Sequence, residues 1–585
     1  MNTKRFTMLL CILITFSISF EALGAIYKPF KHNGIYYCAL TDSTVEVTKT
    51  SGIEDNWYEF YQGTINIPSD ITYDGKNYTV TEIGNQAFRG QGGLTMVVIP
   101  KTVSKICYRA FLGCPNLKSI VFASNGVLTT IEYEAFKGCA ITNVTFPTSL
   151  KEVGSDAFHD CISLKSIKGG DSIETLGDNV FQGCLSLTEF TFPKSLKKIG
   201  DYAFWNCSAL REVVMNEGLE EIGNDAFLQC SSLENIQISN TVKKIGWEAF
   251  RWCLNLKSIV IPNSVEEMGY GVFRYCTGLK RVTLSNSLKV IPAWGFEQTA
   301  LPNVEIPNSV ITIGPYAFRD CANLTEIKWG NSLEKISDEA FLGTAISVLN
   351  LPEPLKIIHP MAFLMCNNLK EVTIPQTTIM ISDQAFAECS NLKTVYNLAL
   401  IPQDIPYNNN PFTHCDSPVE VHIYEGLKDL YLSSIGWGVS IDNNYITLID
   451  DIPAAKVESV VIDKDSIYCT IGETGTATAT VSPSHAFRSE LSWSSSDDTI
   501  LYIDEFSGVY VGLAKGTVTI TATATDGSGV YDSAIVYVSD DTGVNDINID
   551  NKPQNNTIYD LYGRKLSTPT KGINIINGKK VIIYN

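Results

Sequence analysis

Cysteine is the residue type in this chain whose spacing most suggests chemistry. Twelve of the sixteen cysteines occupy one slot, three residues after a phenylalanine. Such a series allows three alternatives: a disulfide framework, a metal array, or a file of buried thiols. The twelve are Cys114, Cys139, Cys161, Cys184, Cys207, Cys230, Cys253, Cys276, Cys321, Cys366, Cys389 and Cys415.

Two substitutions within this series favour buried thiols. Thr299 and Thr344 fill the same slot, so the position accepts a small group that can meet a backbone partner. Side chains in register on stacked turns also point the same way, which suits a ladder better than pairs. The spacing alone leaves bridges open, because neighbouring turns would place the α-carbons within disulfide reach. Metal binding is disfavoured because no Cys-x-x-Cys spacing occurs.

The remaining reactive residues form no catalytic pattern. The six histidines are scattered, and we find no Ser/His/Asp motif and no glycine-rich phosphate loop. Asp546, Asn548 and Asp550 are spaced like the start of a calcium loop, but Asn551 replaces its glycine and Thr557 its closing glutamate. A net charge of −19 argues against nucleic acid as a partner. We therefore expect no enzyme activity, no cofactor and no metal.

A repeat positions the cysteines. The dipeptide Ala-Phe or a close variant recurs, and nine of its thirteen intervals are 23 residues long. The unit reads Ala-Phe-x-x-Cys-x-x-Leu-x-x-Ile-x-Ile-Pro-x-Ser-Val-x-x-Ile-Gly. The landmark residues are Phe88, Phe111, Phe136, Phe158, Phe181, Phe204, Phe227, Phe250, Phe273, Phe296, Phe318, Phe341, Phe363 and Phe386.

Each part of the unit has a structural meaning. Leu-x-x-Ile-x-Ile is a short strand with alternate residues inward, and the proline ends it. Val-x-x-Ile and Ala-Phe supply the apolar contacts of the opposite wall. One unit cannot bury its own apolar face, so the units must stack. The sequence therefore predicts a β-rich leucine-rich-repeat solenoid of about 14 repeats of about 23 residues.

These motifs resemble the BspA-like leucine-rich-repeat proteins of bacterial cell surfaces over about residues 60 to 440. Ile65 to Pro68 and Tyr73 to Lys76 are similar to that family's N-terminal β cap. A strand at Val419 to Tyr424, a helix around Leu427 to Leu432 and then Gly436-Trp437 resemble its closing cap. The resemblance implies adhesion, to host matrix proteins or to other bacterial surfaces.

Alternation along each strand leaves two side chains per repeat on the outer side of the sheet, the concave face in this architecture. They are polar, mildly acidic and nearly free of aromatics, which fits a wide protein-binding surface better than a sugar-binding one. Any single residue can be merely solvated, so the hypothesis rests on the whole face. The candidate residues are Glu189, Thr191, Glu212, Asn235, Gln237, Arg281, Thr283, Asn303, Glu305, Glu326, Lys328, Glu371, Thr373 and Tyr396.

Both ends of the chain carry other signals. Lys4, Arg5, the apolar run from Phe6 to Phe20 and small residues after it predict a signal peptide, too short to span a membrane. No later segment is expected to span a bilayer. Leu491 to Asp497 and Gly512 to Thr517 resemble bacterial Ig-like domains of group 2, which mostly act as stalks. The apolar strands around Asn577-Gly578 are similar to the sorting tails of type IX secretion substrates, which engage the secretion machinery.

We therefore expect a secreted surface adhesin or protein-binding module. The alternative is a structural spacer of the surface or matrix with no dedicated ligand. The predicted domains are a signal peptide (1–24), an N-terminal β cap (25–80), the solenoid (81–415), a C-terminal cap and linker (416–455), an Ig-like β-sandwich (456–539), a linker (540–556) and a short C-terminal β tail (557–585).

Overall fold

The computed structural model describes residues 28–49, 61–405, 410–453, 456–482, 486 and 490–540, and the backbone of four strands between 558 and 583. The predicted signal peptide, with Cys11, and the calcium-like segment at 546–557 lie outside these residues. The chain divides into two units, Met1–Asp451 and Ile452–Asn585. In the described part, no helix is long and apolar enough to cross a membrane.

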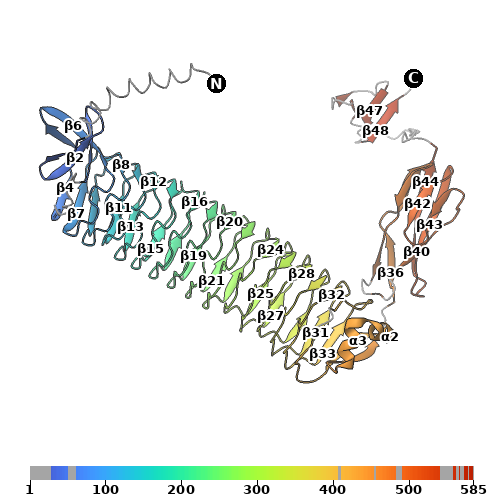
Figure 1. Cartoon of the computed structure of the whole chain (residues 1–585). Helices are drawn as coiled ribbons and strands as arrows, with labels where there is room; N and C mark the ends of the chain where they lie inside the picture. Colours follow the sequence, from blue (N-terminus) through green and yellow to red (C-terminus); the bar gives the residue numbers. More distant parts are fainter. Residues whose placement is uncertain are drawn as a thin grey trace, which may run out of the picture. The chain divides into compact units, whose positions relative to one another are not determined.

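The first unit is the predicted solenoid, with about 16 turns (Figure 1). One wall is formed by parallel strands from the Leu-x-x-Ile-x-Ile segments, and we call its outer side the strand face. The ladder is divided into sheets of two to five strands. Its strands are β4 (Gly63–Asn66), β7 (Leu94–Ile99), β9 (Ser119–Phe122), β11 (Asn143–Phe146), β13 (Ser166–Gly169), β15 (Glu189–Thr191), β17 (Glu212–Val214), β19 (Asn235–Gln237), β21 (Ser258–Val260), β23 (Arg281–Thr283), β25 (Asn303–Glu305), β27 (Glu326–Lys328), β29 (Val348–Asn350), β31 (Glu371–Ile374), β33 (Thr394–Asn397) and β34 (Val419–Tyr424).

The opposite wall, which we call the back wall, is also a parallel sheet. The sequence predicted only apolar contacts there, because two-residue strands leave no alternation to recognise. Its strands come from the Val-x-x-Ile segments: β8 (Lys105–Ile106), β10 (Thr130–Ile131), β12 (Glu152–Val153), β14 (Thr175–Leu176), β16 (Lys198–Ile199), β18 (Glu221–Ile222), β20 (Lys244–Ile245), β22 (Glu267–Met268), β24 (Val290–Ile291), β26 (Thr312–Ile313), β28 (Lys335–Ile336), β30 (Ile357–Ile358) and β32 (Met380–Ile381).

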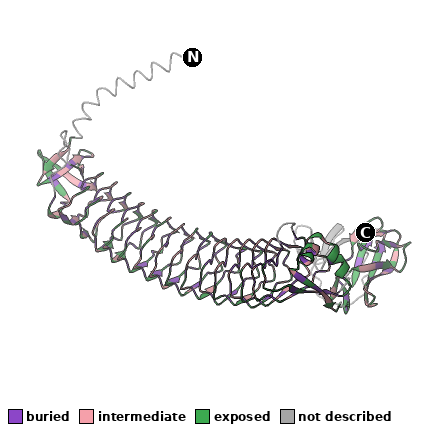
Figure 2. Cartoon of the chain, turned by 60° about the horizontal axis from the view of Figure 1, so that its bottom comes forward, coloured by how far each residue is buried: buried purple, intermediate pink, exposed green. Residues whose placement is uncertain are grey.

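A file of buried phenylalanine rings fills the core between the walls. Successive ring centroids from Phe88 to Phe412 lie 5.0–5.7 Å apart. Phe412 extends the file by one ring beyond the sequence landmarks, and Pro411 stands where most turns have alanine. The buried core and exposed edges repeat along the whole stack (Figure 2). Each turn therefore contacts mainly its two neighbours.

A cap closes each end of the solenoid. The N-terminal cap is built from β1 (Phe30–His32), β2 (Ile35–Ala39), β3 (Thr44–Val47), β5 (Asp70–Tyr73) and β6 (Lys76–Ile83). The C-terminal cap contains α2 (Lys428–Ser433), α3 (Ile435–Asp442) and β35 (Ile446–Ile452). The sequence analysis predicted one helix here, and the structure adds a second: Gly436-Trp437 lies within α3, where Trp437 is fully buried against Tyr431. A helical backbone at this point directs the Trp437 indole into the core of the cap, where its burial stabilises the helix.

The second unit contains the strand-rich region predicted to be Ig-like. Its core is formed by buried residues that include Trp493, Leu501, Ile520 and Val536. The strands are β36 (Ser459–Ile462), β37 (Ser466–Thr470), β38 (Thr474–Thr476), β39 (Ala479–Ser482), β40 (Leu491–Ser495), β41 (Leu501–Ile503), β42 (Val509–Gly512), β43 (Gly516–Ala524) and β44 (Tyr531–Ser539). They form two main sheets, β37-β44-β43-β40 and β38-β42-β41.

The tail forms an antiparallel sheet of β45 (Ile558–Asp560), β46 (Lys565–Leu566), β47 (Gly572–Ile576) and β48 (Lys579–Ile583). β47 and β48 pair as a hairpin, with Ile576 opposite Lys579, as the sequence predicted. The sorting role of this tail stays a prediction.

Candidate binding face

The cysteine slot is structural. Cys253 Sγ donates to the main-chain carbonyl of Phe227 at 3.3 Å, and Cys276 Sγ to that of Phe250 at 3.0 Å. The other ten cysteines of the series make the same bond to the phenylalanine of the preceding turn. The described cysteines are free thiols, and eleven of the twelve in this series are fully buried. The small group with a backbone partner is therefore confirmed.

Burial also removes the chemistry of these thiols. It raises the pKa of Cys161, Cys207 and Cys276 to about 12, so the nucleophilic thiolate is scarce at neutral pH. Thr299 contributes its hydroxyl in the same place, 3.3 Å from the sulfur of Cys321. Within the described residues, no group of three His, Cys, Asp or Glu side chains could hold a metal ion.

The candidate face residues lie where alternation places them. On β15, β17 and β19 the middle residue is buried and its two neighbours are exposed. Of the fourteen candidates, Glu371 and Thr373 are only half-buried and the other twelve are exposed. The pattern of the strand face is therefore confirmed, whereas its binding role stays a prediction.

On β15 and β17, the charges of the strand face are not arranged for stability. Glu189 stands in register with Glu212, and Glu212 with Asn235. Like charges directly opposite each other on adjacent strands destabilise a sheet. Neither carboxylate has an ion-pair partner among the described residues; farther along, Glu305 pairs with Lys328 at 2.6 Å. The unpaired carboxylates can accept hydrogen bonds from a partner.

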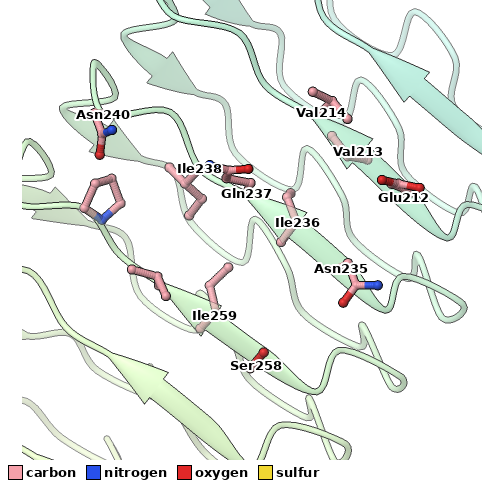
Figure 3. A pocket seen from close by; sticks show the side chains of 12 residues that line it. Glu212, Val213, Val214, Asn235, Ile236, Gln237, Ile238, Asn240, Ser258 and Ile259 are labelled. Atoms are coloured by element: carbon pink, nitrogen blue, oxygen red, sulfur yellow. The ribbon is translucent and has the colours of Figure 1, made fainter.

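A hollow of about 480 Å³ opens beside the Glu212 carboxylate, across β17, β19 and β21 (Figure 3). Val214 and Val260 are 39% and 62% exposed, so the lining offers apolar surface. Gln237 and Asn235 supply donors and acceptors between them. An open hollow that mixes apolar and polar groups can seat side chains of a protein partner.

Two further hollows recur along the same face. One of about 470 Å³ is lined by residues that include Glu189, Thr191 and Lys194, and one of about 380 Å³ by residues that include Thr283, Glu305 and Trp329. Each lies where strands meet the proline turns. The strand face therefore carries a row of separate hollows. Alternation along the strands did not predict them, because side chains of the proline turns form one side of each hollow.

The back wall has the opposite charge arrangement. Lys198, Glu221, Lys244 and Glu267 stand in register on β16 to β22. Lys198 pairs with Glu221 at 3.1 Å and Lys244 with Glu267 at 3.3 Å. A second file alternates beside it: Lys151, Glu174, Lys197, Glu220, Lys243, Glu266 and Lys289. Sequence reasoning missed the charge alternation on this wall, although it repeats at 23-residue steps in the printed sequence.

Comparisons with known proteins agree with this architecture. A family model described as BspA type leucine-rich repeat region matches residues 81–211, 199–301 and 289–418. A second, described as bacterial Ig-like domain of group 2, matches residues 456–534.

Solved structures and curated proteins add relatives. A leucine-rich repeat protein from Bacteroides ovatus is 28% identical, covering 63% of this chain and 94% of its own, with a TM-score of 0.47. A leucine-rich cell surface protein from Faecalibacterium prausnitzii is 22% identical, covering 63% and 94%, with a TM-score of 0.38. A 3-O-alpha-D-galactosyl-alpha-L-arabinofuranosidase of Bifidobacterium longum is 31% identical over 119 residues, 19% of this chain and 10% of that enzyme. The chain spans about a tenth of the length of the first curated relatives it matches.

Proposed function

Because this chain belongs to the family of proteins with BspA-type leucine-rich repeats, we propose that it is a cell-surface adhesin that binds another protein through the strand face. Membership of a family of protein-interaction modules supports protein binding in general. The choice of the strand face rests on the charges and hollows of this chain. The match to the arabinofuranosidase covers too little of that enzyme to bring an activity with it.

The observation that carries the proposal is the contrast in charge between the two walls. Both walls are parallel sheets with the same repeat, so both could use alternating lysine and glutamate to offset in-register repulsion. The back wall does so, and the strand face instead sets Glu189 against Glu212. A sequence that departs from a stabilising rule at one surface commonly does so for function.

The hollows indicate how a partner would be held. Exposed Val214 and Val260 offer apolar contacts, and the adjacent carboxylates and amides fix orientation. With three hollows in series, we expect affinity to be spread along the face. The spacer alternative gives no reason for the two walls to differ in charge.

Export and display belong to the same proposal. Residues 1–24 would direct secretion, the Ig-like region would serve as a stalk, and residues 557–585 would engage the sorting machinery. Host matrix proteins or other bacterial surfaces would be the ligands.

The test is a binding assay of the full chain against purified extracellular-matrix proteins and whole bacterial cells. Competition uses a solenoid fragment of residues 25–453 and, separately, the segment 456–539. We expect the solenoid fragment to abolish binding and the Ig-like segment to have no effect. Competition by the Ig-like segment alone would refute the assignment to the strand face, and absence of all binding would favour the spacer.

A further inference from the structure

A second surface of the solenoid carries a group of side chains that the strand face lacks. In four successive turns, residues just before or just after the core phenylalanine present aromatic rings that contact a ring of the next turn. Trp247 stacks on Tyr270 at 5.0 Å, Trp252 on Tyr275 at 5.7 Å and Trp294 on Tyr316 at 5.1 Å between ring centroids. We call these residues, with two arginines among them, the aromatic ridge: Trp247, Arg251, Trp252, Tyr270, Arg274, Tyr275, Trp294 and Tyr316.

The ridge is continuous and reaches solvent. Tyr270 also meets Trp294 edge to face at 6.1 Å, which joins two of the ring pairs. The Arg274 guanidinium joins the third pair, because it lies 4.7 Å from the centre of the Tyr275 ring and 5.7 Å from that of Trp294. Trp247 is 51% exposed and Tyr270 is 40% exposed. The chain thus keeps large apolar rings at its surface rather than in the core.

Four of these rings stand at positions where the repeat backbone is left-handed in nearly every turn. Trp252, Tyr275, Trp294 and Tyr316 have φ of 60°, 61°, 54° and 59°, the left-handed region. A bulky residue there costs on the order of 1 kcal/mol. Other turns carry glycine in the Trp252 slot, as at Gly113 and Gly343, or a polar side chain, as at Asn206 and Gln229. The slot therefore accepts glycine without a change of backbone.

Two arginines are held among the rings as hydrogen-bond donors. The Arg251 guanidinium lies 3.9 Å from the centre of the Trp252 ring, and that of Arg274 lies 4.7 Å from the centre of Tyr275. Glu248 binds Arg251 at 2.7 Å and Glu297 binds Arg274 at 2.5 Å.

The counter-charges are more deeply buried than the arginines. The Glu297 side chain is 5% exposed and that of Arg274 is 23% exposed. Glu248 accepts from one terminal nitrogen of Arg251, and Glu297 accepts from Nε of Arg274. The other terminal nitrogens of both arginines have no hydrogen-bond partner among the described residues. The ridge therefore offers charged donors between apolar rings.

We propose that the aromatic ridge binds an extended peptide segment that places carboxylates on Arg251 and Arg274 and apolar side chains between the rings. Tryptophan, tyrosine and arginine are the residues that dominate protein-binding hot spots. Core rings of successive turns lie 5.4 Å, 5.5 Å and 5.3 Å apart from Phe250 to Phe318, so four turns span about 16 Å. That length matches about five residues of extended chain. The site is separate from the strand face and does not depend on it.

The test measures fluorescence anisotropy of three labelled hexapeptides, which alternate leucine with glutamate, glutamine or lysine, against the full chain. We expect the glutamate peptide to bind about tenfold more tightly than the lysine peptide and to weaken as salt is raised. The double variant Trp252→Gly/Tyr275→Gly should weaken it about tenfold. The thermal midpoint of this double variant should stay near that of the unsubstituted chain, because glycine adopts the left-handed backbone of these two positions without strain.

Met365→Gly is the matched control, because Met365 occupies the Trp252 slot five turns later with φ of 59° and is 42% exposed. It should leave peptide binding unchanged. Equal affinity for the three peptides, or full affinity in the Trp252→Gly/Tyr275→Gly variant, would overturn the proposal. Tighter binding of a neutral oligosaccharide such as cellohexaose, lost in the double variant, would instead make the ridge a glycan site.

Discussion

The two walls of the solenoid are built from the same repeat and the same parallel ladder, yet they manage charge in opposite ways. The back wall alternates lysine and glutamate from turn to turn, with Lys198 against Glu221. The strand face leaves Glu189 against Glu212, beside a hollow lined by exposed valines. The difference shows one wall whose charges favour cohesion, and it supports our proposal that the other wall binds a partner.

The largest expected effect concerns the core that both walls enclose, where the cysteine thiols should be inaccessible to reagents. If the cysteine file is sealed and reduced, alkylation without reductant should modify almost none of its thiols in the native chain. After denaturation, all should react, which mass spectrometry would count. Thiols that stay unmodified in denaturant would mean disulfides and would contradict the hydrogen-bonded ladder.

Removing one core ring should loosen both walls together. Phe250→Ala deletes a fully buried ring stacked on Phe227 and Phe273 and should cost about 3–5 kcal/mol of unfolding free energy. Because contacts are between neighbours, faster hydrogen exchange should be confined to about residues 227–276. An equal rise in the Ig-like region would contradict the separation of the two units.

Reversing one charge on the back wall should reduce stability. Glu221→Lys would set a third lysine between Lys198 and Lys244. Since these side chains are partly exposed, we expect a loss of about 1 kcal/mol, measured by denaturant unfolding. Glu212→Lys on the strand face is the matched variant: it would face Glu189 with the opposite charge and should raise stability by about 0.5 kcal/mol. Equal losses in the two variants would contradict the contrast.

Between the walls, Asp225 should give a smaller, pH-dependent effect. Burial and the nearby Glu248 raise its pKa to about 6. A raised carboxyl pKa means that the contribution of Asp225 to stability is greatest below about pH 4 and is lost as pH rises through 6. Asp225→Asn should therefore raise the thermal midpoint at pH 7. The corresponding gain in unfolding free energy should be about 1 kcal/mol or less, since the side chain is half exposed. The gain should vanish near pH 4; a constant gain would rule out titration of Asp225.

Periodicity was sufficient to predict the repeat, the inward and outward positions of the strand face and the buried cysteine slot, because each depends on local alternation and burial. Glu189 and Gln237, for example, are exposed as their strand positions require. Phe412 was recognised through Cys415 but not as a repeat landmark, because Pro411 precedes it. The helix at Trp437 was not predicted because it depends on tertiary burial.

The back-wall pairs and the aromatic ridge were harder to predict. Both depend on which residues of different turns come into register, such as Lys244 with Glu267 or Trp294 with Tyr316. Read along the chain, these residues are separated by 22 or 23 positions and resemble ordinary surface charges and rings. Only stacking shows that they are neighbours.

The most direct test of the strand face is to compare charge reversals on the two walls in one binding assay. Full-length chains with Glu189→Lys/Glu212→Lys, or with Glu221→Lys, would be measured by surface plasmon resonance on a matrix protein or bacterial surface that the unsubstituted chain binds. We expect the strand-face variant to lose affinity about tenfold while staying folded, and the back-wall variant to bind normally despite its lower stability. Unchanged affinity in the strand-face variant, or loss only in the back-wall variant, would contradict the account.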